Sequence, residues 1–197
     1  MQISKEYSSD DWSKLKLEEN NEEDWQKAID ILEARLTERF LEPIDILIDA
    51  EKQKAAHKRK FGFTILAIDL LLMETLQAFK EGLETTERKS KQTFTNFLKD
   101  SPHFSKYFTT DELREKFYKE FRCGILHQAE VQSDEAMVWS IGELYEDCGS
   151  FYTVNRTKIH ENIKKDFKDY IKKLRDPNSK KERELFKQKM DAIARKK

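Results

Sequence analysis

A long apolar segment near the middle of the chain constrains the fold most strongly. Between residues 59 and 80, hydrophobic side chains occupy most positions around the helical turn: Phe61, Phe63, Ile65, Leu66, Ile68, Leu70, Leu72, Met73, Leu76 and Phe79. A helix that is apolar almost all round must be covered by other elements. Asp69 interrupts the longest apolar run, so we expect no membrane-spanning segment. The pattern predicts the central, most buried helix of a bundle, ending near Gly82.

Helical periodicity dominates the remainder of the chain. We predict further helices over residues 24–40, 44–54, 86–99, 111–126, 158–174 and 180–197. Two short strand-like runs, Met137–Ile141 and Phe151–Val154, flank a turn and predict a β-hairpin. The expected fold class is therefore mainly α: a helical bundle with a small β-hairpin after the helix that ends near residue 126, and a C-terminal basic helix.

The two ends of the chain carry opposite charge. Residues 1–33 hold 4 basic and 10 acidic residues, whereas residues 156–197 hold 16 basic and 7 acidic ones. We expect a flexible acidic leader over 1–23, a helical domain over 24–176 and a basic C-terminal helix or tail over 177–197. The basic end suits RNA through counterion release, although Lys-rich terminal helices are commonly solvated faces. The acidic leader could cover a basic surface of its own chain or of a partner.

Few residues are available for disulfides or metal binding. The chain has two cysteines, Cys123 and Cys148, and four scattered histidines. Two cysteines make a disulfide framework improbable, and none of the histidines has the spacing of a zinc site. The first residues also lack the apolar core of a secretory signal. We therefore expect a cytoplasmic protein that needs no metal and no cofactor.

The chemistry of the chain is concentrated in the stretch Arg122-Cys-Gly-Ile-Leu-His127. Arginine stays protonated and binds phosphate oxygens with a planar set of donors. Histidine can accept and donate a proton near neutral pH. Together they are the minimum equipment for cleaving a phosphodiester without a metal. The simpler interpretation is a surface arginine and a satisfied histidine that are neighbours only in the sequence.

The residues around this pair resemble a known family. The stretch Phe117 to Glu130 is similar to the Arg-x4–6-His signature of the HEPN superfamily, helical-bundle proteins that include many metal-independent endoribonucleases of toxin, antiphage and RNA-processing systems. The resemblance implies an HEPN-like helical domain and an endoribonuclease whose two motifs meet across a homodimer. It also implies RNA as substrate and an antitoxin or defence protein as partner. In active ribonucleases of the family, Asn, Asp or His often follows the arginine, and here that residue is Cys123.

Helical geometry bears on how the pair could work. In a regular α-helix, residues five apart are separated by roughly 140° around the axis. Either the helix loosens near Gly124 to Leu126, or Arg122 and His127 converge only with a second copy of the motif. We assign catalysis to these two residues and support to Cys123, Gln128, Glu130 and Asp69. Glu130 would neutralise the arginine in the empty site. Asp69 would orient Arg122 or His127, or bond to another helix.

The sequence leaves two functions open. The first is a metal-independent endoribonuclease that uses the RNA 2′-hydroxyl as nucleophile. The second is a non-catalytic HEPN module that binds RNA, nucleotide or a protein partner, and Cys123 favours it slightly.

Overall fold

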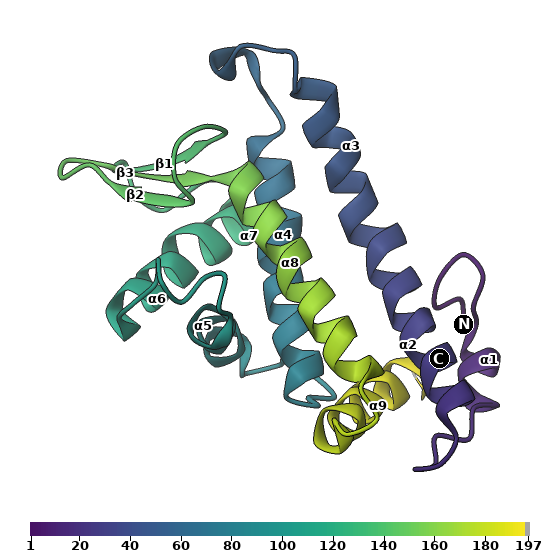
Figure 1. Ribbon diagram of the computed structural model, residues 1–197. Coiled ribbons are helices and arrows are strands. Elements are labelled where there is room, and N and C mark those ends of the chain that lie inside the picture. Colours follow the sequence, from purple (N-terminus) through teal and green to yellow (C-terminus); the bar gives the residue numbers. More distant parts are fainter. Residues whose placement is uncertain (196–197) are drawn as a thin grey trace.

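Helix α4 (Gly62–Lys80) forms the centre of the molecule. The structure, a computed structural model, describes residues 1–195. Helix α8 (Arg156–Arg175) runs beside α4, α3 (Glu42–Glu51) lies along one flank, and α5 (Ser90–Asp100) and α6 (Asp111–Phe117) lie on the other (Figure 1). Gly82 ends this segment with a positive φ of 65°, as the sequence predicts. The mainly helical fold class is therefore confirmed.

Helix α4 is also long and apolar enough, by length and composition, to cross a membrane. Our exclusion of any spanning segment on the basis of Asp69 was therefore too strict. In the structure, 61% of the apolar window of this helix is buried.

The first predicted helices form one continuous helical segment. Helix α2 (Glu22–Leu36) continues through a π-helical turn, η1 (Thr37–Leu41), into α3. Pro43 lies in the first turn of α3, directly after the π-helical turn. Because proline has no N–H to donate to the preceding turn, the helical hydrogen-bond pattern is interrupted here. Asn21 caps the start of α2, because its side chain accepts a hydrogen bond from the backbone N–H of Asp24.

The N-terminal segment is packed, and we had expected it to be loose. Residues 1–23 contain a short helix, α1 (Ser9–Ser13), and the side chains of Ile3 and Trp12 are buried in the core. The indole N–H of Trp12 donates to Asp191 at 2.8 Å, so this segment is bound to the far end of the chain.

Helix α9 (Lys180–Arg195) belongs to the bundle core. Phe186 and Met190 are fully buried, and Phe186 meets Trp12 edge-on, with 5.7 Å between ring centroids. The predicted basic C-terminal segment is therefore a packed helix and not a tail. The predicted basic tail extends to residue 197, so its last two residues lie outside the described ones.

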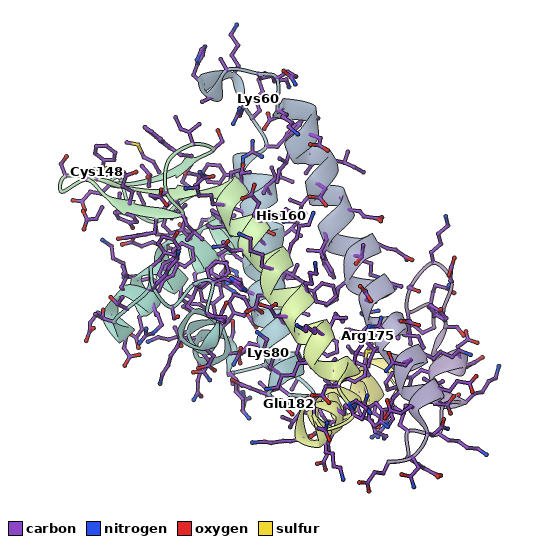
Figure 2. All side chains as sticks on the ribbon, viewed as in Figure 1. Lys60, Lys80, Cys148, His160, Arg175 and Glu182 are labelled. Atoms are coloured by element: carbon purple, nitrogen blue, oxygen red, sulfur yellow. The ribbon has the colours of Figure 1, made fainter. Side chains whose placement is uncertain are left out.

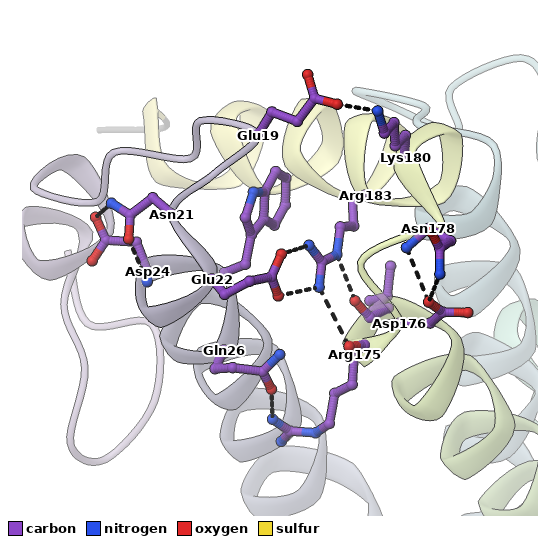
Figure 3. Close-up of polar contacts among 12 residues, drawn as sticks. Glu19, Asn21, Glu22, Asp24, Gln26, Arg175, Asp176, Asn178, Lys180 and Arg183 are labelled. Atoms are coloured by element: carbon purple, nitrogen blue, oxygen red, sulfur yellow. Dashed lines mark hydrogen bonds and ion pairs between the residues drawn. The ribbon is translucent and has the colours of Figure 1, made fainter.

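Ion pairs join the acidic start of the chain to its basic end, as Figure 3 shows. Arg183 makes a two-pronged contact with Glu22 at 2.6 and 2.9 Å, and Lys180 pairs with Glu19. Arg175 donates to Gln26 at 2.7 Å. Of the two roles predicted for the acidic segment, the structure shows the covering of a basic surface of its own chain.

A small sheet follows the motif helices. Its strands are β1 (Ala136–Trp139), β2 (Tyr145–Asp147) and β3 (Tyr152–Asn155), in the order β1-β3-β2. The two predicted runs do pair, but β1 and β3 are parallel and do not form a hairpin. The hairpin is made by β2 and β3, whose turn carries Cys148 at the outer tip of the sheet (Figure 2). We missed β2 because it is three residues long and polar.

The burial of α9 makes a prediction about stability. Replacing Phe186 with Ala removes a fully buried ring and should lower the free energy of unfolding by about 3–5 kcal/mol. Glu184→Ala, on the exposed face of the same helix, should change it by less than about 0.5 kcal/mol. Urea unfolding of both variants measures this difference. Equal stability of the two would mean that α9 contributes nothing to the core.

Candidate functional site

The Arg122–His127 motif lies in an irregular helix. Helix α6 widens into a π-helical turn, η3 (Tyr118–Cys123), and then continues as α7 (Gly124–Gln128). Such π-turns are rare and occur frequently at functional sites. The separation of roughly 140° between Arg122 and His127 applies to a regular α-helix, and the helix is not regular here. The helix loosens as one of our two alternatives required, but one turn earlier than Gly124 to Leu126.

Gly124 is required by the way the chain leaves α7. After His127 the backbone turns back through Ala129, which has a left-handed conformation with φ of 56°. The returning chain passes so close that a Cβ at position 124 would lie 2.5 Å from the carbonyl oxygen of Glu130. A side chain here would displace the segment that ends the motif helix. The glycine therefore fixes where His127 sits.

Arg122 and His127 meet within one chain. The Nη1 atom of Arg122 lies 3.5 Å from Nε2 of His127, at the long limit of a hydrogen bond. The His127 side chain is exposed, while that of Arg122 is mostly buried. This contact brings a permanent cation and a proton acceptor to the same surface point.

Glu74 holds the arginine in this position. Its Oε2 atom accepts from Arg122 Nη2 at 2.8 Å, and its side chain is only 8% exposed. A buried carboxylate needs such a partner, and the charged hydrogen bond is stronger than a neutral one. Glu74 lies on α4, so the ion pair ties the motif to the central helix. Within the described residues, the buried Nε of Arg122 has no hydrogen-bond partner.

A hydroxyl chain extends from Glu74 to the π-turn. Ser90 donates to Glu74 at 2.8 Å, and the Tyr118 hydroxyl donates to Ser90 at 3.2 Å. The Arg122 guanidinium also lies over the Tyr118 ring, 5.6 Å from its centroid. Burial raises the pKa of Tyr118 above its usual value, so the phenol is protonated at neutral pH and can donate. Three side chains from three elements, Glu74, Ser90 and Tyr118, thus fix the guanidinium.

The supporting residues predicted from the sequence are only partly here. Cys123 is half-buried in the motif turn, next to Arg122. Gln128 is exposed at the end of α7. Glu130 accepts from the backbone N–H of Val131 and does not pair with Arg122, so Glu74 has the neutralising role that we expected of Glu130.

Asp69 takes the second of the two roles that we left open, a bond to another helix. It is fully buried and contacts Nδ1 of His160 on α8 at 2.9 Å, while Asp45 on α3 lies 3.3 Å from Nε2 of the same ring. Desolvation raises the pKa of Asp69 to about 6. His160, labelled in Figure 2, therefore links α3, α4 and α8 and lies away from the motif.

A hollow of about 480 Å³ adjoins the motif on the side of the π-turn. Tyr118 and Cys123 line it together with cationic and acidic side chains: Lys91, Lys116, Lys119, Glu115 and Glu120. Lys91 pairs with Glu115 at 2.7 Å, and both are exposed, so solvent weakens this pair. The three lysines place positive charge beside Tyr118 and Cys123 of the π-turn, and the two glutamates offset part of it.

Sequence reasoning missed three members of the site. Glu74 is a carboxylate inside an apolar helix, the same signal that drew attention to Asp69, and could have been found. Tyr118 lies inside the Phe117–Glu130 stretch, where its aromatic ring gives no sign of the hydroxyl contact with Ser90. Nothing local in the sequence distinguishes Ser90.

Comparison with known protein families, with curated proteins and with solved structures finds no match for this chain.

Burial of Asp69 predicts a pH dependence of stability. A carboxyl group whose pKa is raised from 3.8 to about 6 on folding stabilises the fold below pH 3.8. That contribution is lost as the pH rises to about 6, because the folded protein must then bury a charge. The Asp69→Asn variant cannot titrate here. Its stability relative to the parent should therefore increase between pH 4 and pH 6, measured as melting temperature across this range.

The matched control is Asp49→Asn, whose side chain is 72% exposed. The difference in melting temperature between Asp49→Asn and the parent should stay constant between pH 4 and pH 6. If the melting temperature of the Asp69→Asn variant also differs from that of the parent by a constant amount, Asp69 does not titrate between pH 4 and pH 6.

Proposed function

We propose that this protein is a metal-independent endoribonuclease with Arg122 and His127 as its catalytic residues. The observation that carries the proposal is the 3.5 Å contact between Arg122 Nη1 and the exposed imidazole of His127. The HEPN resemblance supports the same function, since its motif consists of these two residues. It also implies a setting in toxin or phage-defence systems, with an antitoxin or defence protein as partner.

The proposed reaction uses the RNA 2′-hydroxyl as nucleophile. Nε2 of His127 takes the hydroxyl proton, and the oxygen attacks the adjacent phosphorus while the bond to the 5′-oxygen breaks. The departing 5′-oxygen takes a proton from the imidazolium or from water; in the alternative assignment, His127 is only this acid and water takes the hydroxyl proton. Positioned acid–base catalysis of this kind contributes about 10²–10⁴-fold. The products are a 2′,3′-cyclic phosphate and a 5′-hydroxyl. DNA lacks the nucleophile and is excluded as substrate.

Arg122 stabilises the charge on the phosphoryl oxygens. Glu74, Ser90 and Tyr118 hold its guanidinium in place before substrate arrives, which is the condition for electrostatic catalysis. Its Nη1 atom faces the exposed His127, whereas Nη2 binds Glu74 and Nε is buried. A phosphate beside the imidazole can therefore bond to the arginine without breaking the ion pair with Glu74.

The lysines beside the π-turn fit the approach of RNA. Lys91, Lys116 and Lys119 line the adjoining hollow and would contact phosphates that flank the cleaved bond. Helix α9 is a weaker candidate for an RNA arm, since Arg183 and Lys180 are engaged by Glu22 and Glu19.

A homodimer remains part of the proposal, although convergence of the pair no longer requires it. Central helix α4 leaves an apolar stripe uncovered: Phe63, Ala67, Ile68 and Leu71 lie at helical spacing and are exposed or half-buried. The stripe continues along the helix toward Glu74, which binds Arg122. We assign it to a second copy of the chain, because a two-fold contact here would bring two motifs to one cleft.

A non-catalytic module that binds RNA, nucleotide or a protein partner is the second candidate. The observation that favours it is the buried Glu74–Arg122 ion pair, which gives the arginine a structural role of its own. Cys123, where active family members often carry Asn, Asp or His, favours it as well.

Cleavage assays test the catalytic assignment. Labelled single-stranded RNA incubated with the protein in excess chelator should be cut to products with 2′,3′-cyclic phosphate ends. His127→Ala and Arg122→Ala should each lower the rate by at least about 10²-fold. Exposed Arg39, which contacts the backbone of Gln2, provides the control Arg39→Ala with an unchanged rate. Circular dichroism checks that each variant folds. Folded His127→Ala and Arg122→Ala variants that cut like the parent would refute the assignment.

The dimer is tested by placing a charge on the apolar stripe. Leu71 is 40% exposed on α4, and Leu71→Glu should convert a dimer into a monomer. Ile46 on α3 is 67% exposed, and Ile46→Glu should leave the dimer intact. Light scattering at tens of micromolar gives the mass of each. A parent protein that is monomeric at this concentration rules out the shared cleft.

A further inference from the structure

Two hollows lie at the end of the molecule where the sheet meets the bundle. The first has a volume of about 400 Å³, the second about 460 Å³, and Arg59, Ser140 and Arg156 line both. The loop between α3 and α4, the turn after β1 and the start of α8 come together there (Figure 1), and Figure 2 marks this loop at Lys60. Volumes of this size are typical of small-molecule sites.

The first hollow, which Trp139 also lines, is separate from the Arg122–His127 motif. Gly62 at the start of α4 lines the first hollow, whereas Glu74 at the motif is twelve residues further along the same helix. At 1.5 Å per residue, the two positions are about 18 Å apart. The inference below does not rest on the proposed ribonuclease activity.

Arg156 supplies a buried cation with unused donors. Its side chain is 2% exposed, and Nη2 donates to Glu51 at 2.9 Å. Its Nε and Nη1 atoms have no hydrogen-bond partner within the described part of the chain. Buried donors are nearly always satisfied, so two orphans on one guanidinium need an explanation. An anion in the pocket would supply acceptors.

The charge around Arg156 leaves room for that anion. Arg59 is half-buried, and its Nε and Nη1 atoms donate to the carbonyls of Lys54 and Ser140. Burial lowers the pKa of Arg156, the ion pair with Glu51 opposes this, and repulsion from Arg59 adds a smaller lowering. Glu51 pairs with Arg156, and its oxygens also accept from the backbone N–H groups of Lys60 and Phe61. Among the described residues that line the first hollow there is no carboxylate.

The opposite wall of the first hollow is apolar and aromatic. Val138, Trp139 and Ile141 line it, and Trp139 and Ile141 are 41% and 48% exposed. The other two tryptophans of the chain, Trp12 and Trp25, are buried in the core. An exposed indole beside two arginines can stack on a flat ring while the guanidinium groups bind a phosphate.

We propose that the pocket between Arg59, Arg156 and Trp139 binds a small phosphorylated molecule with a planar aromatic ring, the chemistry of a nucleoside phosphate. Arg156 and Arg59 hold the phosphate, and Trp139 with Ile141 covers the ring. The site lies where the sheet meets the bundle, and the proposed ribonuclease mechanism uses none of its residues.

Adenosine monophosphate is a suitable probe for the full-length protein. Calorimetry should show saturable binding, and the fluorescence of Trp139 should change, because the other two tryptophans are buried. Adenosine alone and inorganic phosphate alone should each bind at least about tenfold more weakly, since each engages one wall.

Two variants test the arginine side and the tryptophan side of the pocket one at a time. Arg59→Ala should weaken binding of adenosine monophosphate at least about tenfold and leave adenosine binding unchanged. Trp139→Ala should weaken both. Arg59 is used because removing buried Arg156 strands Glu51 and could unfold the protein. His127→Ala should bind the probe like the parent, which separates this site from the motif.

Three outcomes overturn the proposal: no binding at millimolar probe, binding that survives both Arg59→Ala and Trp139→Ala, or binding that is lost in His127→Ala. Failure of RNA cleavage leaves the proposal intact.

Discussion

The burial of α4 is the constraint on which the rest of the structure depends. Its apolar surface requires cover from several helices, and it carries two buried carboxylates, Asp69 and Glu74. Each carboxylate needs a basic partner from another element, and these are His160 of α8 and Arg122 of the π-turn. Buried ion pairs add little net stability, but breaking one is costly, so they select one arrangement of the helices over others. The same interaction that fixes the bundle therefore places the motif arginine.

A local change in helical geometry explains how the two motif residues meet within one chain. The π-helical turn over Tyr118–Cys123 and the glycine at 124 let the arginine and the histidine meet although they are five residues apart. The second copy of the chain then has a different proposed role. In the proposed dimer it would double the cationic surface around one RNA and enclose the site, whereas the pair assembles without it.

The sequence predicted the features that depend on periodicity and composition. The central helix, the helical bundle and the position of the motif at the end of a helix follow from apolar spacing. The features it missed depend on contacts between distant residues: the packing of residues 1–23 on α9, the parallel pairing of β1 and β3, and the partner of Arg122. Asp69 shows the limit clearly. Its burial implied a partner, but only the fold shows that the partner is His160 and not a motif residue.

The central claim is that Arg122 and His127 act on one phosphate. A crystal structure of the protein with a short RNA carrying a 2′-O-methyl group at the scissile position tests it most directly, because the blocked nucleophile prevents cleavage. The account predicts a phosphate oxygen within about 3 Å of the Arg122 guanidinium and the 2′-oxygen within about 3 Å of His127 Nε2. RNA bound elsewhere on the molecule, with the arginine and histidine making no contact to it, would contradict the account.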